Sequence, residues 1–186
     1  CARGSRAYGV AADGPSGVWS IGATLTMQLV FGTLATLGFL AALGVHAGAL
    51  LGMPVQDQIP QVWVLHVGVF VVFIPAFFHL KKHTEKGDPL GYFRRMPAWA
   101  VVLLLALFLY LFLNFSVLRP APGEGTPDIR NGQYVLHKKG RVLREISQAE
   151  YRAGRAAEAR LFSGHWLLFY ALSAAVFLVR SKRGEG

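Results

Sequence analysis

Long stretches of the chain carry no charged residue. Four of them lack Asp, Glu, Lys and Arg: residues 14–56, 58–80, 96–118 and 161–179. An α-helix needs about 20 apolar residues to cross the hydrocarbon core of a bilayer, and each of the last three stretches matches one crossing. The first is long enough for a hairpin, but it has no turn signal between residues 24 and 48, so we expect one helix over about 24–50. The pattern predicts an all-α integral membrane protein with four transmembrane helices.

Composition excludes the main alternatives to a membrane protein. Of the 186 residues 53% are hydrophobic and only 16% are charged, whereas soluble domains carry roughly a quarter charged residues. The single cysteine, Cys1, excludes an intramolecular disulfide framework and a cysteine-based metal cluster. The net charge of +9 is not accompanied by a basic patch with interleaved aromatic residues. We therefore expect a lipid bilayer, and no nucleic acid, as a partner.

The short connections predict the orientation. The segment between the second and third stretches is basic, while the one between the first and second contains only Asp57. Because short basic segments stay in the cytoplasm, we expect a multi-pass membrane protein with both termini cytoplasmic. Residues 119–160 would then face outward. They also carry more basic than acidic residues, but long folded segments weigh less in this rule.

The outward segment has local structure of its own. Residues 119–132 are rich in Pro and Gly and predict an irregular connection. Residues 133–136 and 142–146 flank a turn containing Gly140 and predict a β-hairpin. Ser147 and Glu150 match a capping box, from which one long helix can run into the fourth span. The resulting organisation is an N-terminal arm (1–23), transmembrane helices 1–3 (24–118), an exoplasmic loop with a β-hairpin (119–147), and a long last helix with a cytoplasmic tail (148–186).

Each predicted helix places a polar side chain at one depth, just below the outer interface: His46, His66, Asn114 and His165. Polar groups at such a depth usually face the bundle interior. The three imidazoles could bind a metal, or two of them a haem. However, no two of them lie four residues apart and no acidic residue accompanies them. We favour a structural polar layer and keep the histidines as candidate ligands only.

Other residues indicate anchoring and packing rather than chemistry. Four tryptophans lie near predicted membrane boundaries and predict interface anchors: Trp19, Trp63, Trp99 and Trp166. Gly44, Gly48 and Gly52 recur every four residues, which permits close helix approach, although glycine is also simply frequent in membrane helices. The sequence contains no phosphate loop, nucleophile elbow or paired carboxylates. We therefore do not expect an enzyme.

Several segments together resemble an uncharacterised family of small four-helix bacterial membrane proteins. The resemblance spans roughly residues 25–180 and rests on residues 65–75 (LHVGVFVVFIP), 131–136 (NGQYVL), 144–147 (REIS), 150–151 (EY), 162–166 (FSGHW) and 169–170 (FY). It implies the hairpin, the long last helix and a location in the inner membrane, but no activity. Lys138, Lys139 and Leu167 depart from the family pattern, and the arm before residue 24 resembles an extension.

Three functions follow as hypotheses. We expect a non-catalytic accessory subunit of a larger bacterial membrane complex, for example respiratory or photosynthetic, with residues 1–24 and 131–160 as contact surfaces for other membrane protein subunits. The alternative is a metal- or haem-binding protein that uses His46, His66 and His165. A small transporter or lipid-handling protein is supported only by Pro75 and by the glycines of the first helix.

Overall fold

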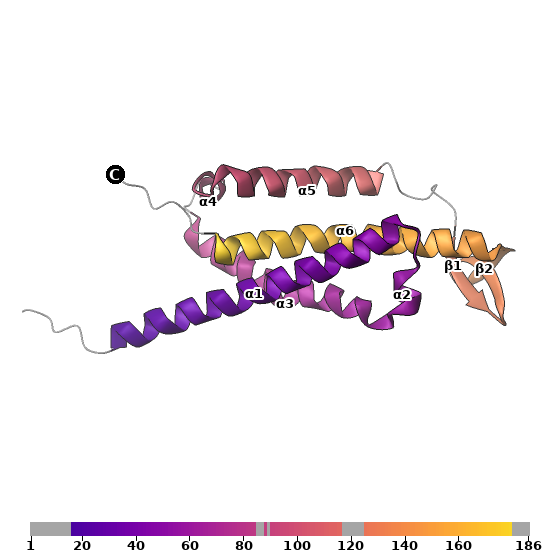
Figure 1. Ribbon diagram of the computed structural model, residues 1–186, viewed down its shortest axis with the longest axis horizontal. Helices are drawn as coiled ribbons and strands as arrows, with labels where there is room; N and C mark the ends of the chain where they lie inside the picture. The colour runs from indigo at the N-terminus through magenta and orange to yellow at the C-terminus, as the bar shows by residue number, and fades with distance from the viewer. Residues whose placement is uncertain (1–15, 85–87, 89, 117–124, 180–186) are drawn as a thin grey trace, which may run out of the picture.

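The computed structural model describes residues 16–84, 88, 90–116 and 125–179, with side chains from Leu25 onward. Figure 1 shows a bundle of long helices with a small sheet at one end. The elements in chain order are α1 (Ser16–Leu50), α2 (Val55–Gln58), the 3-10 helix η1 (Pro60–Trp63), α3 (Val64–His83), α4 (Gly91–Arg94), α5 (Ala98–Ser116), β1 (Thr126–Arg130), β2 (Gln133–Lys138), β3 (Arg141–Glu145) and α6 (Gln148–Leu178).

The prediction of four membrane-length apolar helices is confirmed. In the part of the chain that the structure describes, the segments long and apolar enough to cross a membrane are Leu25–Leu50, Pro60–His83, Ala98–Ser116 and Gln148–Leu178. Helix α1 begins at Ser16, so that residues 16–23, which were expected in the N-terminal arm, are helical. The uncharged stretch already begins at residue 14, and no proline follows Pro15 until Pro54. Residues 1–15 of the arm and 180–186 of the tail lie outside the described residues.

Helix α6 is the centre of the bundle. Figure 1 shows it between α5 on one side and α1 and α3 on the other, and α1, α3 and α5 all pack on α6. The outer helices keep large apolar side chains such as Leu37, Val67 and Phe108 more than half exposed. Helices that are apolar on all sides suit a lipid environment. We name the two ends of the bundle the sheet end and the α4 end, which are opposite each other in Figure 1.

Tyr170 sets the closest approach between three helices. Its ring lies against Gly38 of α1 and its hydroxyl against Gly68 of α3, where an added Cβ would overlap with it in both cases. The hydroxyl donates to the carbonyl oxygen of Leu65 over 2.8 Å. The expected close packing at Gly44 and Gly52 is wrong, because nothing lies within 4 Å of a Cβ built at either position. A Cβ at Gly48 would instead meet Val55 of the short helix α2.

The sheet has three antiparallel strands in the order β1-β2-β3. The predicted hairpin is confirmed as β2 and β3. Residues 126–130, which were expected in an irregular connection, instead form β1. An edge strand tolerates Pro127, and Asn131 and Gly132 both have positive φ, 51° and 78°, as tight hairpin turns require. The rest of the expected connection, residues 119–124, lies outside the described residues.

The sheet is supported by the long helix. Ser147 and Glu150 form the predicted capping box, and α6 continues without interruption over 31 residues. Its first turns carry the sheet: the Tyr134 and Tyr151 rings lie 4.9 Å apart between centroids, and an added Cβ at Gly154 would meet Pro127. The first part of α6 therefore supplies the support that an isolated hairpin would lack.

Candidate functional site: a buried polar cluster near the sheet end

His46 is the centre of a buried hydrogen-bond chain that joins three helices. The side chain is 4% exposed. Its Nδ1 lies 2.8 Å from Oγ of Ser163 on α6, and its Nε2 lies 2.5 Å from the hydroxyl of Tyr110 on α5. Ser163 donates its hydroxyl proton to the carbonyl oxygen of Ala159, 2.6 Å away, and can only accept from His46.

The bond from Ser163 to Ala159 favours one tautomer of the imidazole. In that tautomer Nδ1 carries the proton and donates to Ser163, and Nε2 accepts from Tyr110. All hydrogen bonds of the cluster then point the same way: Tyr110 donates to His46, His46 to Ser163, and Ser163 to the backbone of α6. Both ring nitrogens of His46 are used within the protein. A metal could bind His46 only if one of these hydrogen bonds broke.

Asn114 completes the cluster one helical turn beyond Tyr110 on α5. It is 1% exposed, and its Nδ2 donates to the carbonyl oxygen of Arg160 over 3.2 Å. Gly164 makes room for it, because an added Cβ would lie 2.9 Å from Nδ2. The Oδ1 atom is buried and has no hydrogen-bond partner among the described residues. A small donor such as a water molecule would satisfy it.

His66 lies apart from this cluster. The indole of Trp166 donates from Nε1 to Nδ1 of His66 over 3.1 Å, and His66 itself is exposed. Trp166 is 2% exposed and packs at right angles against Trp63, at 5.9 Å between ring centroids. Its side chain is therefore part of the core, whereas the sequence led us to expect an interface anchor.

The other expected anchors differ from one another. Trp99 is 63% exposed, Trp63 is half-buried, and the side chain of Trp19 lies outside the described residues. The fourth member of the expected polar layer, His165, is half-buried and bonds from Nδ1 to the carbonyl oxygen of Leu161 in its own helix, 2.8 Å away.

The polar side chains thus meet α6 within about two helical turns but do not converge on one point. Residues 160–166 of α6 receive His46, Asn114 and His66 on different sides. Among the described residues no group of three or more His, Cys, Asp or Glu side chains could hold a metal ion. The arrangement fastens α1, α3 and α5 to α6.

Sequence reasoning did not identify Tyr110 and Ser163 as partners of His46. The available signals were weak: Tyr110 lies four residues before Asn114, which places both on one face of a helix, and Ser163 precedes Gly164 in an otherwise apolar span. Neither signal indicates which helix the side chain meets.

A second set of polar contacts, closer to the surface, joins the turn between α1 and α3 to α6 at the sheet end. The Asp57 carboxylate accepts from Arg155 over 2.7 and 2.9 Å and from the hydroxyl of Tyr151 over 3.0 Å. Gln56, which is 4% exposed, donates to the carbonyl oxygen of Arg155 over 2.6 Å. These bonds connect the α1–α3 turn to α6.

Comparisons with known proteins add no family or activity. No protein-family model, curated protein or solved structure matches the chain.

Proposed function

We propose that the protein is a non-catalytic accessory subunit of a larger bacterial membrane complex, of a respiratory or photosynthetic kind. The observation that carries this proposal is strand β3. All five of its residues are exposed, and two of them, Val142 and Leu143, are apolar and about half exposed. They lie on the sheet, beyond the apolar helices, so we expect a neighbouring protein and not lipid to cover them.

The polar cluster supports the same proposal. His46 and Asn114 are used to hold helices together, and His66 and His165 bond to neighbouring groups. The histidines do not form one ligand set. The described geometry therefore favours a supporting role over the metal- or haem-binding alternative.

The proposed location is the inner membrane, with the α4 end in the cytoplasm. Lys81 and Lys82 at the end of α3 and Arg94 and Arg95 beside α4 give that end a basic character. Short basic segments favour the cytoplasmic side. The sheet would then face outward, together with the exposed strand β3. The resemblance of residues 25–180 to a family of bacterial membrane proteins supports this location.

Photo-crosslinking in the native membrane tests the proposal. A photoreactive amino acid replaces Leu143, and a matched one replaces Leu109, which is 59% exposed on α5. The proposal predicts a discrete adduct between position 143 and a different membrane protein, and no comparable adduct from position 109. Position 143 giving no protein adduct, or giving only adducts with further copies of this chain, would contradict it.

A further inference from the structure

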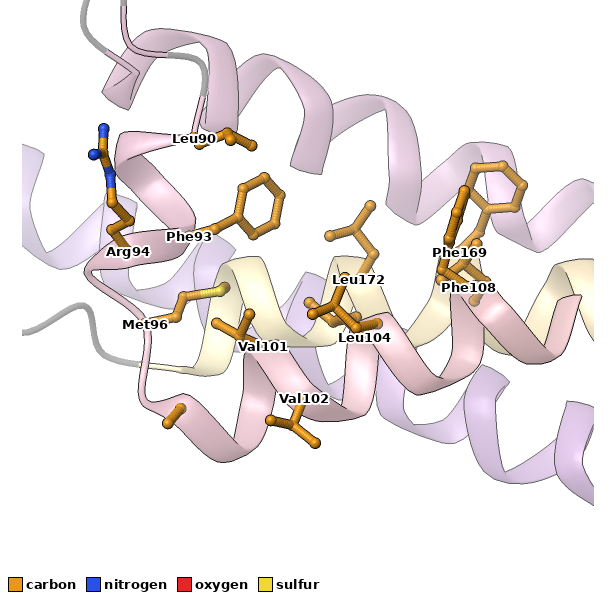
Figure 2. Close-up of a pocket in the computed structure, with 13 residues that line it drawn as sticks. Leu90, Phe93, Arg94, Met96, Val101, Val102, Leu104, Phe108, Phe169 and Leu172 are labelled. Atoms are coloured by element: carbon orange, nitrogen blue, oxygen red, sulfur yellow. The ribbon is translucent and has the colours of Figure 1, made fainter. Parts of the chain in front are cut away.

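An apolar groove opens between α4, α5 and α6 at the α4 end of the bundle. Its volume is about 790 Å³, within the range of roughly 300–1,000 Å³ that is usual for small-molecule sites. Figure 2 shows Leu90 and Phe93 at one end, Val101, Leu104 and Phe108 along α5, and Phe169 and Leu172 from α6.

The groove is preformed because α4 is fixed to α6. Tyr92 is 7% exposed, and its hydroxyl donates to the carbonyl oxygen of Val176 over 3.0 Å. Met96, 5% exposed, holds the next turn of the chain against the same core. With Tyr92 and Met96 buried, Leu90 and Phe93 are left to form the end wall of the groove.

One charged side chain, Arg94, is among the residues that line the groove. Figure 2 shows it at the α4 end, beside Leu90 and Phe93. Arg94 is paired with Asp88, but its side chain is 71% exposed and keeps donors directed to the surroundings. A ligand that matches both parts has a long apolar chain and an anionic head.

In a bilayer such a hollow does not stay empty, because the side chains that line it would lose their van der Waals partners. We propose that the groove binds one anionic phospholipid of the inner leaflet, with an acyl chain along α5 and α6 and its phosphate beside Arg94. The inference rests on the proposed membrane location. It does not depend on the larger complex, so a particle without a partner protein would leave it standing.

Lipid retention measured by native mass spectrometry tests the inference. The detergent-purified protein is exchanged into mixed vesicles of phosphatidylglycerol and phosphatidylcholine, extracted, and its bound lipids are counted. We expect one retained lipid per chain. The expected preference for phosphatidylglycerol is about fivefold, which corresponds to about 1 kcal/mol for one basic side chain near the membrane surface.

Two pairs of variants test the contributions of the lipid head group and of its acyl chain separately. Arg94→Gln is expected to abolish the preference while a lipid is still retained, and Lys81→Gln, which removes a cation at the same end of the bundle, to leave it unchanged. Leu105→Trp in the groove is expected to lower retention of both lipids several-fold. Leu109→Trp, one turn further along α5 and outside the groove, is its matched control.

The inference fails if the wild type retains no lipid or retains both lipids equally. It also fails if Arg94→Gln and Lys81→Gln change the preference for phosphatidylglycerol equally. The same holds if Leu105→Trp and Leu109→Trp lower lipid retention equally. Equal effects would indicate general attraction to the basic end or general disturbance of α5. Circular dichroism of each variant monitors its folding. If Arg94→Gln misfolds, Arg94→Lys, which keeps the charge, is expected to keep the preference for phosphatidylglycerol.

Discussion

Ser163 on α6 bonds to His46 on α1 and donates its own hydroxyl proton to the backbone carbonyl oxygen of Ala159. Ser163 and His46 are separated by 117 positions in the sequence, and the bond joins the first long helix to the last. Because Ser163 has no second proton, the bond to Ala159 favours the direction in which Tyr110 donates to His46 and His46 donates to Ser163.

Replacing Ser163 with Ala is expected to destabilise the protein by about 1–3 kcal/mol, the cost of removing the partner of a buried polar group. The group that loses its partner is the imidazole of His46. Thermal unfolding of the protein in mild detergent measures the loss. Ser173→Ala is the matched control, since Ser173 is as fully buried on the same helix but donates only to Phe169 in its own helix. Equal losses from the two variants would contradict the proposed role of Ser163.

The glycines of α1 provide a second prediction. Gly38→Ala is expected to cost about 1–3 kcal/mol through overpacking, because the new methyl group would overlap with the Tyr170 ring. Gly44→Ala is expected to be neutral or to stabilise by about 0.5–1 kcal/mol, since alanine favours a helix more than glycine does and the site is open. Unfolding midpoints of the two variants check this, and the reverse order would show that Tyr170 does not set the helix spacing.

Sequence reasoning predicted the elements of this fold better than their contacts. Uncharged stretches predicted the four long helices, and Ser147 with Glu150 predicted where α6 begins. Strand β1 was missed because its neighbours are rich in Pro and Gly, although Asn131 and Gly132 carried a strong hairpin signal.

The contacts of the polar layer were harder to predict for a physical reason. The outer helices are apolar on every side, so their periodicity does not show which face is buried. Trp166 is in the core and His66 is exposed, which the sequence pattern did not indicate. Only the packing of α6 decides which side chain meets which.

The sheet is expected to lose stability in acid. The Arg130 side chain, 3.1 Å away, followed by the backbone N–H of Ile129, holds the pKa of the Asp128 carboxyl below its ordinary value of 3.8. A lowered folded-state pKa stabilises the fold above the unfolded pKa, and this contribution is lost as the pH falls through the folded pKa.

Hydrogen exchange of the β1–β2 amides, corrected for intrinsic rates, measures this effect. Protection is expected to fall in the wild type as the pH is lowered from about 5 to below 3.8, the ordinary pKa of the Asp128 carboxyl. Asp128→Asn is expected to show a smaller change over the same interval. A variant with the full wild-type pH dependence would rule out Asp128 as its source.

The composition of the native particle tests the central claim most directly. Membranes of the source organism are solubilised in mild detergent, and the particle that contains this chain is purified, weighed by native mass spectrometry and resolved into its components. The account predicts a particle with at least one different membrane protein. Introducing two negative charges on strand β3, by Val142→Glu together with Leu143→Glu, is expected to release that protein. A monodisperse particle that contains only this chain would contradict it.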